Sequence, residues 1–132
     1  MESMERLMER QAENGFAVLT GICVEAAEGD TVVCRLDLRP EVANHLGYFH
    51  AGALYTLAEN TAGTAAFHVD GRRYVTQTGS IQYISNRSQG AVRATAHILH
   101  HGRSTCMVRT ELTAEDGTLL CIGEFALFCA GA

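Results

Sequence analysis

The chain has 132 residues, a mass of 14.3 kDa and a formal net charge of −5. This length predicts a single domain over residues 1–132, and the 47% hydrophobic content supplies a core, which excludes a disordered chain. The negative charge argues against nucleic acid as a partner. No apolar run approaches the roughly 18 residues of a membrane helix, and the N-terminus lacks a signal-peptide core, so we expect a cytoplasmic protein without membrane attachment.

Acidic and basic side chains are unevenly distributed. Residues 1–71 carry eleven acidic and four basic side chains, whereas residues 72–109 contain six arginines and no aspartate or glutamate. We therefore expect the second half to be able to receive an anion, although arginines scattered as solvated heads on strands would give the same composition. The five cysteines include no CxxC pair and mostly lie in apolar runs, which predicts small buried hydrophobic residues in a reducing compartment.

The first half of the chain predicts one helix and a hairpin. Apolar and long side chains recur every three or four residues over residues 1–13, which is typical of an amphipathic helix. Residues 16–27 and 31–39 are rich in apolar and β-branched side chains, and a Glu-Gly-Asp turn separates them. Pro40 ends the second predicted strand and opens a loop to residue 49.

The second half predicts one long helix followed by strands. Ala, Leu and Thr dominate residues 50–69 at helical spacing, so this helix should be buried on more than one side. Strand-like segments follow, with turn residues between them: 74–84, 91–100, 104–113 and 119–129. The order predicts the α+β class, in which an antiparallel meander of strands wraps the long helix.

The start of the long helix has the features of an anion receptor. A polar loop over residues 44–50 leads directly into it, and the first backbone N–H groups of a helix have no partner within the helix. Ala51, Gly52 and Ala53 are small enough to let a ligand approach those groups closely. We expect an oxyanion or a phosphate to bind there.

Glu59 is the one carboxylate within this apolar helix before its last residues. Burying an unpaired carboxylate is costly, so Glu59 is either functional, paired with an arginine, or placed at an exposed helix edge. Gly63, one turn later, costs about 1 kcal/mol relative to alanine, which indicates that a substrate or a second helix packs closely against it.

These residues form a recognisable pattern. Asn44-x-x-Gly47-x-x-His50-Ala51-Gly52, followed by Leu57-Ala58-Glu59, resembles the signature of the hotdog-fold acyl-CoA thioesterases, particularly the branch of the phenylacetate-pathway thioesterase. The resemblance covers essentially the whole chain and implies a hotdog fold, with a long central helix wrapped by an antiparallel sheet of five to six strands. The chain departs from the family pattern at Ala51, where a glycine is usual.

The resemblance also implies a site for thioester hydrolysis. Asn44 would direct its side-chain amide, and Ala51 its backbone N–H, toward the thioester carbonyl. Glu59 would act as the general base or nucleophile, and Thr76 would orient the attacking water. In this family the two pairs of groups come from neighbouring subunits, which implies a homodimer or a dimer of dimers.

The remaining implied contacts concern the substrate, a small or medium acyl-CoA. His50, Gly52 and Gly63 would surround it, with His50 shaping the loop and the helix cap. Arg87 and Arg103, both at turns, are the candidates for the coenzyme A phosphates. We expect neither a metal nor a cofactor apart from coenzyme A within the substrate.

Alternative functions remain open at this point. A hotdog domain that binds or senses acyl-CoA without hydrolysing it would share the pattern, and Ala51 in place of glycine makes this plausible. A hotdog hydratase is the third alternative. Coenzyme A and an acyl carrier protein are both compatible with the sequence as the thiol carrier.

Overall fold

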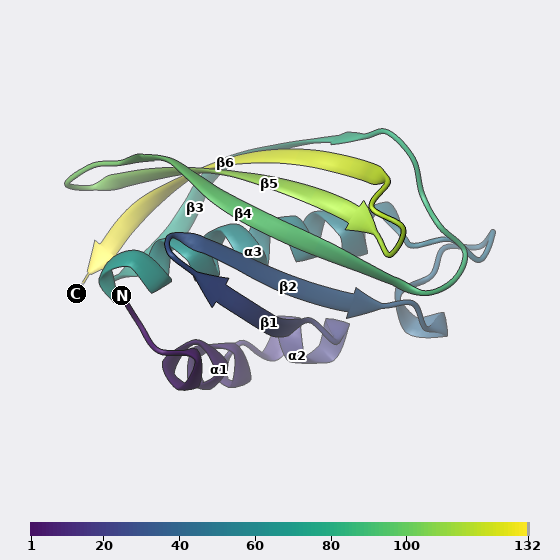
Figure 1. Ribbon diagram of the computed structural model, residues 1–132, viewed down its shortest axis with the longest axis horizontal. Helices are drawn as coiled ribbons and strands as arrows, with labels where there is room; N and C mark the ends of the chain where they lie inside the picture. The colour runs from purple at the N-terminus through teal and green to yellow at the C-terminus, as the bar shows by residue number, and fades with distance from the viewer. Residues whose placement is uncertain (132) are drawn as a thin grey trace.

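The computed structural model describes residues 1–131. Its elements are α1 (Met4–Glu13), α2 (Gly15–Thr20), β1 (Cys23–Glu28), β2 (Thr31–Asp37), a short 3-10 turn η1 (Pro40–Val42), α3 (Ala51–Asp70), β3 (Arg73–Tyr83), β4 (Ala91–His101), β5 (Thr105–Ala114) and β6 (Leu119–Gly131). In Figure 1 the curved sheet arches over α3, while α1 and α2 lie along the lower side of the molecule. Across residues 1–131, no helix has the length and apolar character needed to cross a bilayer.

The described residues form one antiparallel sheet of six strands in the order β1-β2-β4-β5-β6-β3. The predicted α+β class, strand number and helix-in-sheet arrangement are therefore confirmed. The meander holds for β4, β5 and β6, but its extension to β3 is wrong, because β3 pairs with β6 at the sheet edge. Turn residues between β3 and β4 predict that the chain reverses, but they do not determine which strand pairs with β3. The connection here runs across the end of the sheet, so β3 and β4 are not neighbours.

The strand predicted over residues 16–27 is wrong in its first part, where the chain forms α2. Asn14 caps this helix, since its Oδ1 accepts a hydrogen bond from the Ala17 N–H at 3.2 Å. Gly21 ends it with φ +91°, a left-handed conformation that glycine adopts without strain. Caps at both ends outweigh the β propensity of the apolar residues between them, so only Cys23–Glu28 forms a strand.

The first helix is confirmed, with a narrower apolar stripe than its spacing predicts. Ser3 caps α1 by accepting a hydrogen bond from the Arg6 N–H at 3.2 Å. Leu7 and Gln11 are buried, whereas Met8 is 57% exposed. One face of α1 therefore packs on the domain, and the side chains beside that face are available for other contacts.

The core lies between α3 and the sheet. The helix side chains that face it are at most 1% exposed: Leu54, Leu57, Ala58, Ala62, Ala65 and Ala66. Truncating a buried leucine such as Leu57 to alanine removes about 2–5 kcal/mol from a folded domain, so this packing holds the helix in place. Burial on more than one side, predicted from the composition of the helix, is confirmed.

Three of the five cysteines are core residues, as predicted. Cys34, Cys106 and Cys121 are buried, and desolvation raises the pKa of each thiol to about 11. These cysteines therefore stay protonated and pack as small apolar groups. The prediction is wrong for Cys23, which begins the edge strand β1 and is exposed.

Candidate active site

The loop before α3 is organised around Asn44. Its side-chain Oδ1 accepts hydrogen bonds from the backbone N–H groups of Leu46 at 2.9 Å and Tyr48 at 3.1 Å. The side-chain amide Nδ2 has no hydrogen-bond partner within residues 1–131. Asn44 therefore uses its oxygen to shape the loop and keeps its donor free, as its predicted role requires.

The end of β3 and the loop after it, residues 83–87, hold the segment before α3 in place through hydrogen bonds. The Asn86 amide donates to the Phe49 carbonyl at 2.8 Å, and the Phe49 N–H donates to the Arg87 carbonyl at 3.3 Å. Tyr83 adds a hydrogen bond from its hydroxyl to the Ala51 carbonyl at 2.8 Å. Residues 83–87 therefore fix the position at which α3 begins.

His50 caps α3, in agreement with its predicted role. Its Nδ1 accepts a hydrogen bond from the Gly52 N–H at 2.8 Å, and its carbonyl accepts from the N–H groups of Ala53 and Leu54. Among the first four amides of the helix, only that of Ala51 has no acceptor within residues 1–131. One exposed N–H thus remains at the positive end of the helix, where it can stabilise a developing negative charge.

Glu59 lies about two turns further along α3 and is half-buried. The hydroxyl of Thr76 on β3 donates a hydrogen bond to its Oε2 at 2.8 Å. The pairing of β3 with β6 shifts register between Thr76 and Thr78, so a bulge at Gln77 adjusts the strand at this point. The two predicted residues meet here, and the hydroxyl fixes the orientation of the carboxylate.

A cavity of about 270 Å³ opens beside Glu59 and Thr76. Arg10 of α1 reaches into its wall and donates from Nη1 to the Thr64 hydroxyl at 3.0 Å. A Cβ atom on Gly63 would lie 3.1 Å from Nη2 of Arg10. The predicted close approach at Gly63 therefore exists, and an arginine side chain from the first helix makes it.

Arg10 is a residue of this cavity that the sequence pattern missed. It flanks the apolar stripe of an amphipathic helix, a position where charged side chains usually reach solvent. Burial lowers the pKa of its guanidinium, and the negative charge of Glu59 opposes that shift. The helix-interior glycine at position 63 was the one signal in the sequence that pointed to a close neighbour.

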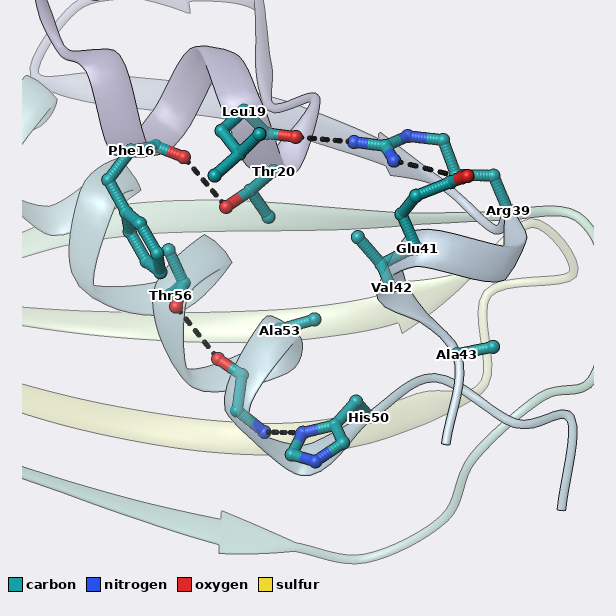
Figure 2. A pocket seen from close by; sticks show the side chains of 11 residues that line it. Phe16, Leu19, Thr20, Arg39, Glu41, Val42, Ala43, His50, Ala53 and Thr56 are labelled. Atoms are coloured by element: carbon teal, nitrogen blue, oxygen red, sulfur yellow. Dashed lines mark hydrogen bonds and ion pairs between the residues drawn. The ribbon is translucent and has the colours of Figure 1, made fainter. Parts of the chain in front are cut away.

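A second, mainly apolar pocket of about 610 Å³ borders the start of α3 (Figure 2). Phe16 and Leu19 of α2 line it from one side, Ala53 and Thr56 of α3 from another, and Val42 from the preceding loop. Arg39 holds the loop to α2 by donating from Nη2 to the Leu19 carbonyl at 2.6 Å. The helix start thus has an apolar surface beside its polar donors.

The two predicted phosphate ligands lie at opposite ends of α3. The Arg87 carbonyl accepts from Phe49 before the helix begins, whereas the Arg103 carbonyl accepts from Arg72 just after the helix ends. A helix of 20 residues is about 30 Å long, so the two arginines cannot bind one phosphate group within one chain. Arg87 also pairs with Asp116 at 3.4 Å, while the side chain of Arg103 is exposed.

The donor groups and the carboxylate are likewise separated within one chain. Ala51 and Glu59 are eight residues apart on α3, which corresponds to about 12 Å along the helix axis. Reacting atoms must approach to about 3–3.5 Å, so these groups cannot act on the same carbon in a single subunit. The structure therefore brings together Glu59 with Thr76, and Asn44 with the helix start, as two half-sites.

Comparisons with known proteins bear on this arrangement. Residues 12–127 match the family model described as "Domain of unknown function (DUF4442)". A 1,4-dihydroxy-2-naphthoyl-CoA hydrolase of Listeria monocytogenes is 30% identical over 112 residues, which cover 83% of this chain and 91% of the relative.

Two solved structures extend the comparison to the fold. The PaaI protein from the phenylacetic acid degradation operon of E. coli matches with a TM-score of 0.85 at 18% identity over 98% of both chains, which shows a shared fold. A hypothetical thioesterase of Streptococcus pneumoniae, solved with coenzyme A, matches with a TM-score of 0.78 at 25% identity over 84% of this chain and 90% of that one. The chain belongs to the hotdog-fold acyl-CoA thioesterase family.

Proposed function

We propose that this protein hydrolyses a small or medium acyl-CoA thioester to the free acid and coenzyme A. The observation that carries the proposal is the hydrogen bond from Thr76 to Glu59, which holds a carboxylate in an otherwise apolar helix whose first N–H, at Ala51, is free. The relative from Listeria monocytogenes is named as a hydrolase of an acyl-CoA, which supports the same class of substrate.

The reaction divides between the two half-sites. The Asn44 amide and the Ala51 N–H polarise the thioester carbonyl and stabilise the oxyanion, a contribution of about 3–4 kcal/mol for one such donor. Glu59, acting as general base, takes a proton from a water molecule that Thr76 helps to orient, and the water oxygen forms a bond to the carbonyl carbon. Collapse of the oxyanion breaks the C–S bond, and the departing thiolate receives the proton. Direct attack by Glu59 on the carbonyl is the alternative use of the same carboxylate.

This mechanism needs a second copy of the chain, so we propose that the working unit is a homodimer. The 12 Å or so between the two half-sites along α3 supports this, because a neighbouring copy can supply the missing half. Strand β3, which carries Thr76, is an edge strand of eleven residues with a largely exposed surface. An unpaired edge of that length is a ready surface for pairing with a second copy.

The proposed activity is tested with Glu59→Gln, which keeps the side-chain shape and removes the base. We expect release of free thiol from a panel of acyl-CoA esters to fall by at least about 100-fold. Glu28→Gln, at the edge of the sheet opposite to β3, is the matched control and should retain full turnover. Unchanged turnover by Glu59→Gln on every ester would refute the assignment, and tight ester binding without thiol release by the unmodified protein would favour a binding domain.

Mixing two inactive variants tests the shared site. Asn44→Ala damages one half-site and Glu59→Gln the other, so a mixed dimer contains one site with both defects and one intact site. After unfolding and refolding together in equal amounts, the mixture should recover about a quarter of the unmodified activity, since half of the dimers are mixed. No recovery, although the mixed dimers have formed, would show that all groups act within one subunit.

A further inference from the structure

Arg10 presents a guanidinium group to the cavity beside Glu59. Its Nη1 donates to Thr64 at 3.0 Å, its Nη2 lies against Gly63, and its carbon Cζ sits 5.6 Å from the centre of the Phe67 ring. These contacts come from three positions on α3, one turn or more beyond Glu59. The side chain is therefore held in place before any ligand binds.

This cation has no carboxylate partner. Within residues 1–131, no carboxylate oxygen lies within 4.0 Å of Arg10, whereas Arg6 on the same helix pairs with Glu2 at 3.2 Å and Arg93 pairs with Glu25 at 2.8 Å. Holding a partly buried cation without an ion pair is unfavourable, and an anionic ligand would relieve that cost.

The other polar side chains that line the cavity each have a hydrogen-bond partner. The Asn14 amide donates to Asn60 Oδ1 at 3.2 Å, and the Asn60 amide donates to Gln11 Oε1 at 3.1 Å. Thr76 is committed to Glu59. The remaining N–H groups of Arg10 are thus the donors that a ligand in this cavity would meet.

We propose that Arg10 selects acyl thioesters whose acyl group carries a second carboxylate, that is, monothioesters of short dicarboxylic acids. The inference rests on the proposed hydrolysis, because it places the acyl group in the cavity beside Glu59. A guanidinium matches a carboxylate with two parallel N–H donors, a geometry that neither a hydroxyl nor a methyl group uses fully. The acyl chain keeps the distal carboxylate away from Glu59, which stands at the reacting end.

The part of the cavity that one chain encloses is small. At about 270 Å³ it lies below the range of about 300–1,000 Å³ that drug-sized ligands occupy. Long apolar chains would gain nothing from Arg10, and the separate apolar pocket beside α2 is the surface that suits them. The two cavities therefore favour different acyl groups: the one beside Glu59 favours a short acidic acyl group, and the one beside α2 favours a long apolar chain.

The test compares esters of equal carbon number: succinyl-CoA with butyryl-CoA, and glutaryl-CoA with valeryl-CoA. We expect the unmodified protein to prefer the acidic member of at least one pair by about tenfold to a hundredfold in kcat/KM, the range for a hydrogen bond to a charged group. Arg10→Met should remove that preference. Arg6→Met is the matched control, because Arg6 lies on the same helix over the same Phe67 ring but does not line the cavity, and it should keep the preference.

Several results would overturn the proposal. They are equal rates for both members of both pairs, a preference that survives in Arg10→Met, or a preference for 4-hydroxybenzoyl-CoA over benzoyl-CoA without one for either acidic ester. If Arg10→Met does not fold, Arg10→Gln is used, since its amide can still reach Thr64 while its charge is gone. A preference retained by Arg10→Gln counts against the proposal in the same way.

A binding measurement separates this inference from the proposed hydrolysis. Succinyl-CoA and butyryl-CoA are titrated against Glu59→Gln and against Glu59→Gln combined with Arg10→Met. Tighter binding of succinyl-CoA that depends on Arg10 supports the inference even if no ester is hydrolysed. Hydrolysis of neutral esters that depends on Glu59, with no effect of Arg10 on either binding or rate, refutes the inference alone.

Discussion

The Thr76 hydroxyl donates a hydrogen bond to the Glu59 carboxylate at 2.8 Å, and this bond joins an edge strand to the central helix. Glu59 stands on the central helix, whereas Thr76 stands on the edge strand, next to a bulge. A bulge changes the direction of side chains on a strand, so the hydroxyl is aimed at the carboxylate by the irregularity of β3.

Removing this hydroxyl should lower turnover while leaving substrate binding nearly intact. We expect Thr76→Val to reduce kcat by about tenfold to a hundredfold with little change in KM, because a hydrogen bond to a charged group contributes roughly 1.5–3 kcal/mol. Thr76→Ser should keep most of the activity. Thr78→Val, on the other side of the bulge and exposed, serves as the control and should be fully active. A loss of kcat in Thr78→Val of the same size would point to the strand itself instead of the hydroxyl.

His50 should matter for stability through its cap on α3. Replacing it with alanine removes the acceptor of the Gly52 N–H, and we expect the free energy of unfolding to fall by about 1 kcal/mol. Asn is a good helix cap, so His50→Asn should recover most of the loss in urea unfolding experiments. If both variants lose the same activity but only His50→Ala loses stability, the imidazole also contacts the substrate.

The sequence predicts which residues lie in each half-site better than it predicts which elements bring those residues together. The residues themselves indicate an anion receptor at the start of the long helix and an unusual carboxylate at Glu59, whereas the roles of Asn44, Ala51 and Glu59 in hydrolysis are what the family resemblance implies. Thr76 is separated from Glu59 by only the end of α3 and the start of β3, and its role followed from the resemblance.

Arg10 illustrates what a sequence pattern leaves undetermined. Its helix is amphipathic, but periodicity does not say on which element the helix packs, nor that an arginine beside its apolar stripe reaches a cavity. The same reason explains the error at α2, where the caps at Asn14 and Gly21 decide the conformation of an apolar segment. Long-range partners, such as β6 for β3, depend on the packing of the whole sheet.

A substitution at Gly63 should raise stability while it lowers the preference for acidic substrates. In Gly63→Ala the added methyl group would lie 3.1 Å from Nη2 of Arg10, so the guanidinium must move by a few tenths of an ångström from the position that Thr64 and Phe67 give it. We expect the free energy of unfolding to rise by up to about 1 kcal/mol, the helix propensity difference, while the preference for acidic esters decreases.

A second glycine provides the contrast for this prediction. In Gly123→Ala the methyl group would lie 2.8 Å from both Thr110 Oγ1 and the Phe125 ring, in a buried part of β6. Such overpacking should cost about 1–3 kcal/mol in thermal or urea unfolding. A destabilised Gly63→Ala would mean that Arg10 is fixed too firmly to move.

Asp70 should make the free energy of unfolding depend on pH in the acidic range. Burial alone raises its pKa, but hydrogen bonds from the Tyr74 hydroxyl at 2.6 Å, from Arg72 and from His101 outweigh burial and hold the pKa well below its usual range. The carboxylate thereby joins the end of α3 to β3 and to the end of β4. Because the folded pKa is depressed, this contribution is complete above the unfolded pKa of about 3.9 and is lost as the pH falls below it.

We therefore expect Asp70→Asn to lower the free energy of unfolding by about 1–3 kcal/mol at pH 7, a difference that stays constant to about pH 5. Below about pH 4 the difference should shrink, because the unmodified protein must then protonate the same group on unfolding. Urea titrations at several pH values measure this, with Asp30→Asn in the exposed β1–β2 turn as the control that changes little. A difference that grows toward low pH would mean that Asp70 is destabilising as a carboxylate, since the sign of the linkage would be reversed.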